Sequence, residues 1–302
     1  MKIGEQDINK VFVVECLREN DLSTGTKIKE HILTQEPNTD VRYLNCIAKS
    51  DFLRHLNEIL NAATSDDGFL LFIEVHGSVA GIELGGELVP WAELTTMLQA
   101  INERLHMGLV VVFSCCFGVH FYRQTSILGR SPYYVMFGVD NSIYADRLLK
   151  MNQALVDGFY CNDSLMEVET RANTQLNIHD INLTHLEAGA LLVGAFTNYF
   201  TKQLAIDPLL NRFEETYQVY RRITPENAMT HSQYKKHYFD FIFKRETLMN
   251  GFNDIRDKFL MTDLDGTLYE RFHVDFDEVY SRLNVEARMK QVYGEIFAIQ
   301  SI

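Results

Sequence analysis

Two side chains that can carry out thiol chemistry each follow an apolar run of this sequence. His76 comes directly after residues 69–75, and Cys116 ends the run that begins at Val110. A cysteine thiolate is a strong nucleophile, and an imidazole beside it can take up the thiol proton and later deliver it to a leaving amine. The two residues therefore predict a Cys/His dyad for nucleophilic catalysis.

Each residue taken alone also has an ordinary structural explanation. A cysteine at the end of a buried strand is often simple packing, and a single histidine is often a satisfied polar residue. The joint pattern favours function, because both residues end apolar runs and both are followed by glycines that let the backbone approach closely. Cys115 adds an ambiguity: alternation along a strand sends Cys115 and Cys116 to opposite faces, so only one can meet His76.

The apolar runs themselves predict a parallel sheet. Runs that are apolar on both faces are typical of strands buried inside such sheets, and reactive groups gather just beyond the carboxyl ends of those strands. Strands are expected over residues 11–17, 41–47, 69–75, 110–116 and 133–139. Helices are expected over residues 27–34, 51–63, 91–105 and 145–160, with Ser50 or Asp51 as the cap of the second. The alternation predicts an α/β sandwich with helices on both faces of the sheet.

The motifs in this context resemble a known family. His-Gly at 76–77, a helix, and Ser-x-Cys-x-Gly at 114–118 are similar to the pattern of the caspase-fold (clan CD) cysteine peptidases, especially their bacterial CHAT-like members. The resemblance covers residues 8–190 and aligns Cys116, rather than Cys115, with the family nucleophile. It implies a caspase-like fold, His76 as the catalytic base, and an oxyanion hole formed by the amides of Gly77 and Cys116.

The same resemblance suggests a substrate-binding residue. In this family, residues just after the fifth strand often line the pocket for the residue that precedes the cut, and here that residue is Asp140. A carboxylate in such a pocket would pair with a substrate Arg or Lys. The alternative is that Asp140 caps the following turn together with Asn141 and Ser142.

Composition limits the class of protein. The 302 residues are 46% hydrophobic, which is typical of globular proteins. A net charge of -13 argues against nucleic-acid binding and favours cationic substrates or partners. Five cysteines at irregular spacing fit a reducing compartment. Without a leader, a membrane-spanning apolar run, a zinc motif or a nucleotide-binding loop, we expect a cytoplasmic protein that uses no metal, cofactor or membrane.

The C-terminal part has a different character. We expect a peptidase domain over residues 1–190 and a helical extension over residues 191–302, with helices near 191–204, 209–223 and 232–245. The extension either packs on the sheet or binds a regulatory protein partner. Its basic residues include Lys235, Lys236, Lys244 and Arg245. They would either contact an acidic partner or form a solvated helix face.

A second motif lies in this extension. Residues 263–267, Asp-Leu-Asp-Gly-Thr, resemble the signature of haloacid-dehalogenase-type phosphatases, in which an aspartate nucleophile lies beside bound magnesium. Only 34 residues follow Leu268, which is too few for the remaining strands of that fold. A turn is therefore the preferred interpretation.

Together these features predict a caspase-like cysteine endopeptidase that cleaves a partner protein after a basic residue. The resemblance implies a role in bacterial antiviral defence or programmed cell death, and that role rests on family analogy alone. The alternative is a catalytically silent caspase-fold module that serves as a binding or regulatory surface.

Overall fold

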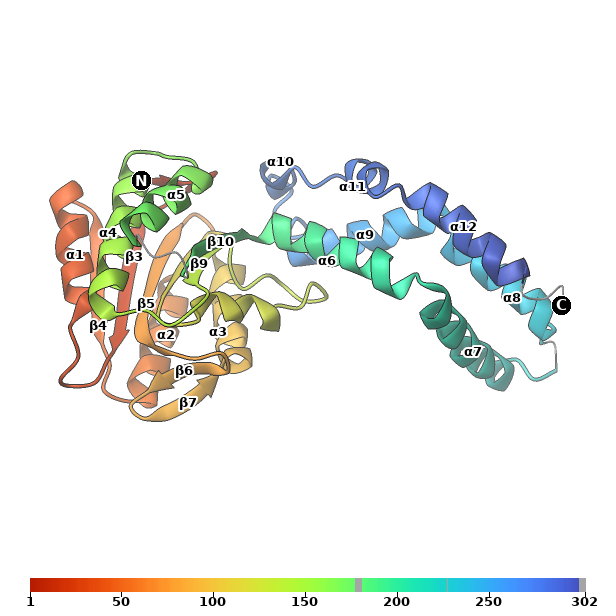
Figure 1. Ribbon diagram of the computed structural model, residues 1–302, viewed down its shortest axis with the longest axis horizontal. Helices are drawn as coiled ribbons and strands as arrows, with labels where there is room; N and C mark the ends of the chain where they lie inside the picture. Colours follow the sequence, from red (N-terminus) through yellow and green to blue (C-terminus); the bar gives the residue numbers. More distant parts are fainter. Residues whose placement is uncertain (177–180, 227, 299–302) are drawn as a thin grey trace. The chain divides into compact units, whose positions relative to one another are not determined.

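The computed structural model describes residues 1–176, 181–226 and 228–298, which form two compact units (Figure 1). The first unit comprises Met1–Ala188 together with Asp263–Gly266, and the second comprises Gly189–Thr262 and Thr267–Ile302. The boundary lies close to the predicted one at residue 190. The short segment Asp263–Gly266, expected in the extension, belongs with the first unit.

The first unit is an α/β sandwich built on one mostly parallel sheet. The strand order is β10-β9-β8-β5-β3-β4, and every neighbouring pair except β10 with β9 is parallel. The strands are β3 (Lys10–Cys16), β4 (Asp40–Asn45), β5 (Phe69–Gly77), β8 (Leu109–Ser114), β9 (Val135–Val139) and β10 (Leu183–Glu187). All six residues of β8 are buried, as expected for a strand covered on both faces. The predicted α/β class is confirmed.

Two hairpins complete the strands of this unit. Strands β6 (Gly81–Leu84) and β7 (Glu87–Pro90) form a hairpin that pairs with the end of β5. Strands β1 (Lys2–Ile3) and β2 (Gln6–Asp7) form a small separate hairpin. The β6–β7 hairpin pairs with β5 at His76 and Gly77.

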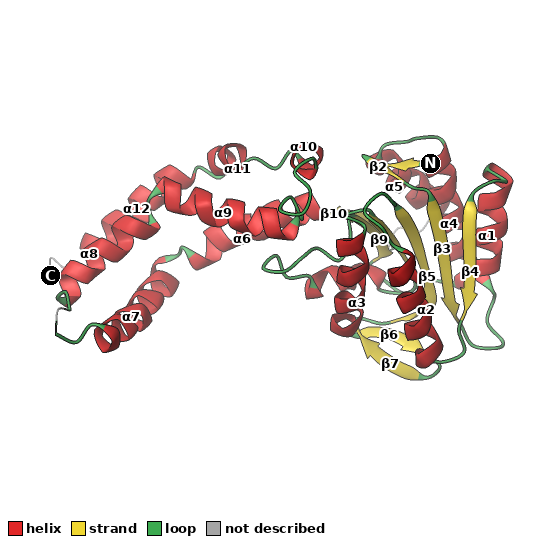
Figure 2. Ribbon diagram, turned by 180° about the vertical axis from the view of Figure 1, so that it is seen from behind, coloured by secondary structure: helices red, strands yellow, loops and turns green. Residues whose placement is uncertain are grey.

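Helices cover both faces of the sheet (Figures 1 and 2). On one face, α4 (Ala145–Tyr160) packs against both α1 (Thr24–Gln35) and α5 (Leu165–Leu176). On the other face, α2 (Lys49–Ala62) packs against α3 (Trp91–Arg104). Each helix buries an apolar stripe such as Leu94, Leu98 and Ile101 of α3.

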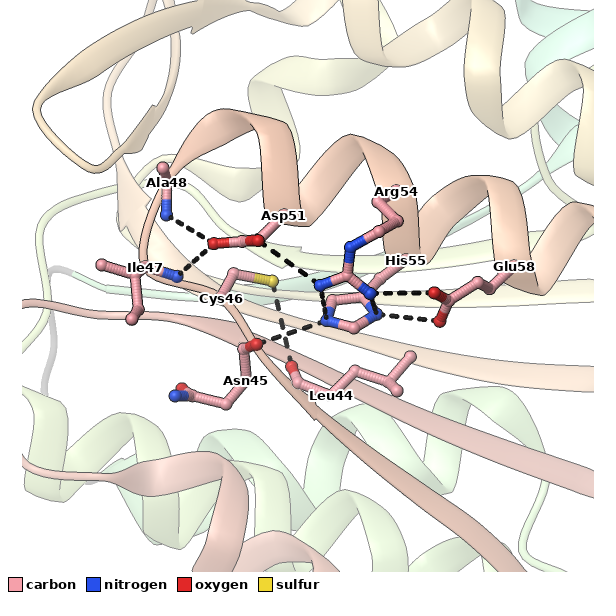
Figure 3. A network of polar contacts seen from close by, with 9 residues as sticks. All are labelled: Leu44, Asn45, Cys46, Ile47, Ala48, Asp51, Arg54, His55 and Glu58. Carbon is pink, nitrogen blue, oxygen red and sulfur yellow. Dashed lines mark hydrogen bonds and ion pairs between the residues drawn. The ribbon is translucent and has the colours of Figure 1, made fainter.

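The start of α2 differs from the prediction that Ser50 or Asp51 caps it. The helix begins at Lys49 after Ala48, and Asp51 in its first turn accepts hydrogen bonds from the backbone N–H groups of Ile47 and Ala48 at 3.2 and 3.3 Å (Figure 3). The hydrogen bond from Ile47, followed by a hydrogen bond from the Arg54 side chain, holds the pKa of Asp51 below its ordinary value. The Asp51 carboxylate, at the third position of the helix, thus accepts from the backbone N–H groups that come just before the helix, which is the part of a capping box that this position supplies.

The second unit is helical and has an aromatic core. Its helices are α6 (Ala188–Gln203), α7 (Ile206–Ile223), α8 (His231–Ile242), α9 (Arg245–Phe259), α10 (Leu268–Phe272), α11 (Phe276–Arg282) and α12 (Val285–Ala298). Phe213 and Phe239 are fully buried with ring centroids 5.7 Å apart. None of the helices in the described ranges is both long and apolar enough to cross a membrane.

Two expectations for this unit need correction. The predicted helix over 232–245 is two helices, because α8 ends at Ile242 and α9 begins at Arg245. Lys235 does not lie on a solvated face: it is buried, and its Nζ donates to the carbonyl oxygen of Ile296 at 3.2 Å. Lys244 and Arg245 form ion pairs with Glu246 and Asp277 respectively.

The Asp-Leu-Asp-Gly-Thr motif lies in a turn between α9 and α10, not at the end of a strand. The Asp263 carboxylate receives two hydrogen bonds from the Arg130 guanidinium, one of them at 2.8 Å. This pairing lowers the pKa of Asp263. Asp263, the aspartate that the phosphatase motif would use as nucleophile, is therefore paired with the side chain of Arg130.

Candidate active site

The structure brings the His-Gly and Cys-Cys segments together at one edge of the sheet. Strands β5 and β8 are neighbours, and their register pairs Glu74 with Ser114, two residues before His76 and Cys116 respectively. A Cβ atom built on Gly77 would lie only 2.1 Å from the carbonyl oxygen of Cys116. Only glycine permits this approach. The two predicted catalytic segments are thus in direct backbone contact.

His76 is held by an acidic residue from another loop. Its Nε2 lies 2.7 Å from Oδ2 of Asp21, in the segment between β3 and α1. The same oxygen accepts a hydrogen bond from the backbone N–H of Arg18 at 2.8 Å. Partial burial alone would raise the pKa of Asp21, but the hydrogen bonds from His76 and Arg18 outweigh it and hold this pKa below its ordinary value. Asp21 is therefore an ionised partner of the His76 ring, bound at Nε2, and Nδ1 is the other ring nitrogen.

Asp21 is the site residue that sequence reasoning missed. It lies 55 positions before His76 in a short polar segment, without a motif around it. One signal was present: Asp21 follows the first strand, and side chains beyond the carboxyl ends of parallel strands meet at one edge of the sheet.

The two adjacent cysteines have different environments. Cys115 is 1% exposed, and burial, with smaller contributions from Cys116 and Glu74, raises its pKa well above the ordinary value. Cys115 is thus held as an inert thiol. Cys116 is partly exposed, and its Sγ lies 3.4 Å from the backbone nitrogen and 3.6 Å from the carbonyl oxygen of Ile143. Of the two, Cys116 is the one that a substrate can reach.

The backbone turns sharply after Cys116. Phe117 has a φ of 59°, in the left-handed region, and its N–H donates to the carbonyl oxygen of Asn141 at 3.2 Å. The short 3₁₀ helix Gly118–Gln124 follows. Cys116 therefore lies at an elbow between a buried strand and a helical turn.

A small cavity lies beside His76. Its volume is about 280 Å³, and its lining residues are His76, Gly77, Ser78, Gly81, Glu83, Gly86 and Leu88. Glu83 pairs directly with His76 across β5 and β6, and its carboxylate is 2.6 Å from Arg18. The hairpin that follows the histidine thus contributes one carboxylate, paired with Arg18, to the cavity.

Asp140 is exposed at the end of β9. Its Oδ1 accepts a hydrogen bond from the backbone N–H of Asn182 at 3.0 Å, just before β10 begins. In this structure the carboxylate fastens one chain segment to the next, and its assignment as a substrate-binding residue stays a prediction.

The oxyanion hole and the absence of a metal also stay predictions. The contact of Gly77 with Cys116 places the two proposed donor residues side by side. Within residues 1–176, 181–226 and 228–298, no group of three or more His, Cys, Asp or Glu side chains is arranged to hold a metal ion.

No protein-family model matches this chain, and no curated protein matches its sequence.

Proposed function

We propose that this protein is a cysteine endopeptidase in which Cys116 is the nucleophile, His76 the general base and Asp21 the residue that orients His76. The observation that carries the proposal is the 2.7 Å contact between Asp21 and His76 at the edge where Cys116 emerges. A nucleophile, a base and a third group that orients the base form the recurrent arrangement of covalent hydrolases.

The chemistry follows from these roles. His76 accepts the thiol proton of Cys116, and the thiolate attacks the scissile carbonyl carbon to form a C–S bond. Backbone amides of Gly77 and Cys116 would stabilise the oxyanion. His76 then protonates the leaving amine as the C–N bond breaks, and water hydrolyses the thioester to release the acid and restore the thiol.

The proposed substrate carries Arg or Lys next to the cut bond. Two carboxylates support this choice, Asp140 after β9 and Glu83 in the cavity beside His76. Glu83 is paired with Arg18, whose side chain is 66% exposed. Such exposed pairs contribute little to stability, so a substrate guanidinium can take the place of Arg18 at little cost.

Hydrolysis of fluorogenic peptides tests this function. We expect turnover of peptides with Arg or Lys before the reporter group, and loss of turnover in Cys116→Ala and His76→Ala. Asp140→Asn and Glu83→Gln separate the two candidate carboxylates. Substitution of the carboxylate that binds the basic side chain should raise KM for Arg and Lys peptides only. Turnover that persists in Cys116→Ala contradicts the proposal.

A silent binding module is the second candidate, and one observation favours it. The Cys116 sulfur already makes two contacts with the Ile143 backbone, and Cys116 is not among the residues that line the cavity beside His76. In that case the strand ends would form a docking surface. A Cys116 that reacts no faster than an exposed cysteine would support this function.

The proposed biological role is cleavage of a partner protein in bacterial defence or programmed cell death, and its support is the sequence resemblance. We also propose that the helical unit binds a regulatory protein. An apolar cavity of about 420 Å³ on this unit supports that role, and its lining includes Tyr220, Tyr234, Tyr238 and Phe241.

A further inference from the structure

Three polar side chains form a row across the sheet just below the candidate active site. Glu15, Glu74 and Ser114 lie on adjacent strands β3, β5 and β8, and the register pairs each with the next. All three are at most 3% exposed. Paired residues of neighbouring strands project from the same face, so the row occupies one layer of the sheet. We call it the polar row.

The two helices on that face supply buried partners for the row. From α1, the Thr24 hydroxyl donates to Oε2 of Glu74 at 2.6 Å. From α4, the Asn152 amide donates to the Ser114 hydroxyl and lies 3.4 Å from Oε1 of Glu74. Asn152 is fully buried. It therefore links the strand that carries His76 to the strand that carries Cys116.

The next layer repeats this arrangement with the catalytic residues. His76 is two positions beyond Glu74 and is bound by Asp21, from the loop that leads into α1. Cys116 is two positions beyond Ser114 and contacts Ile143, from the loop that leads into α4. The β5 end is thus contacted by α1 at the polar row and by the loop before α1 at His76. The β8 end is contacted by α4 at the polar row and by the loop before α4 at Cys116.

Stability alone does not explain an asparagine at position 152. Its Oδ1 is buried and has no hydrogen-bond partner among the residues that the structure describes. A buried acceptor left without a partner costs about 1 to 3 kcal/mol, and replacing a polar pair by apolar groups of the same shape is often neutral or stabilising. Apolar residues at both positions 114 and 152 would therefore serve the fold at least as well.

We propose that Asn152 is a positioning residue which, through Ser114 and Glu74, fixes the spacing of the strand ends that carry Cys116 and His76. This inference rests on the proposed function. Asn152 acts through the strands and does not touch the substrate. Displacing reacting groups by about 1 Å can cost up to 100-fold in rate, so a link one layer below the dyad has a large effect on its reactivity.

The test measures alkylation of Cys116 by iodoacetamide at pH 7, with mass spectrometry to locate the label. Cys161 is exposed and serves as an internal reference in the same sample. We expect Cys116 to react at least about 10-fold faster than Cys161 in the wild type. Asn152→Ala should reduce that advantage about 10-fold or more, with a fall in kcat and little change in KM for peptide substrates.

Two further variants separate positioning from folding. The pair Ser114→Ala with Asn152→Leu removes the polar link while keeping the core filled, so it should fold and still lose the fast reaction of Cys116. Leu155→Ala, a fully buried change on the same helix, should lower the melting temperature without changing the ratio of the two rates.

The outcomes distinguish this inference from the proposed function. Equal rates for Cys116 and Cys161 in the wild type overturn both. If Cys116 is alkylated fast in the wild type and equally fast in the Ser114→Ala, Asn152→Leu variant, only the positioning role is overturned. The positioning role is also overturned if Leu155→Ala reduces the rate advantage of Cys116 as much as Asn152→Ala does. Any weakening of α4 would then be enough to slow the reaction of Cys116.

Discussion

At the scale of single residues, the site depends on a carboxylate that the substrate does not touch. Asp21 holds the His76 ring through Nε2 and is itself fixed by the backbone N–H of Arg18. In the proposed mechanism, an ionised carboxylate in this place fixes the ring orientation and stabilises the imidazolium that forms when His76 takes up the thiol proton.

Asp21→Asn should lower kcat for peptide substrates by about 10- to 100-fold, because the ring loses both its charge partner and its fixed orientation. KM should change little, since Asp21 makes its contacts with His76 and Arg18. Asp163→Asn, which removes the ion pair with Arg171, is the matched control and should leave kcat unchanged. An Asp21→Asn enzyme with wild-type kcat would exclude the orienting role.

Glu74 gives the fold a dependence on pH. Burial, opposed by hydrogen bonds from Ser114 and Thr24 and reinforced by Glu15, raises its pKa from 4.5 to about 8. The folded protein therefore keeps this proton while the unfolded chain loses it near pH 4.5, so stability falls as pH rises to about 8 and is constant above.

Glu74→Gln removes this titration. The difference in free energy of unfolding between Glu74→Gln and the wild type should grow in favour of the variant from pH 5 to pH 8, by roughly 3 to 4 kcal/mol. Urea unfolding at intervals of pH measures it. A difference that is flat across this range would show that Glu74 is ionised in the folded protein.

At the scale of the elements, the candidate site depends on the close approach of the ends of β5 and β8. At Gly77 the two backbones lie too close for any side chain to fit between them. Gly77 at the end of β5 faces the carbonyl oxygen of Cys116 and, at 2.9 Å from its built Cβ, the sulfur of Cys115. This contact lies beyond Glu74 and Ser114, the last paired residues of β5 and β8, and is independent of which cysteine reacts.

Gly77→Ala should push these strand ends apart. We expect a loss of about 1 to 3 kcal/mol in the free energy of unfolding and slower labelling of Cys116. Gly129→Ala is the control, since its nearest atoms would lie at 3.5 Å and its effect should stay within about 0.5 kcal/mol. Equal behaviour of the two variants would contradict the close approach.

At the scale of the whole molecule, each unit has its own core. Phe213→Ala should destabilise the helical unit by about 3 to 5 kcal/mol, because this buried ring contacts several other aromatic rings. Limited proteolysis should then cut within residues 189–262 while the fragment 1–188 stays resistant. Phe241→Ala, at a 58% exposed position, should not change the cleavage pattern, and protection of 189–262 in Phe213→Ala would contradict separate cores.

The sequence predicted the sheet well because buried parallel strands are short, continuous apolar runs with little ambiguity. Five parallel strands and the helices that cover them lie within a few residues of their expected positions. It missed the break at Phe243 and Lys244, since no proline or glycine marks it. For Asp21 the sequence offered only its place after the first strand, and the polar row could not be predicted because its contacts join residues that are far apart in the chain.

The central claim is that Cys116 is activated by His76, and covalent labelling with a peptidyl ketone carrying Arg or Lys tests it most directly. The account predicts rapid, single-site modification of Cys116 in the wild type and a large loss of rate in His76→Ala, with Cys161 unlabelled in both. Labelling of Cys116 that is slow in the wild type, or equally fast in His76→Ala, would contradict it.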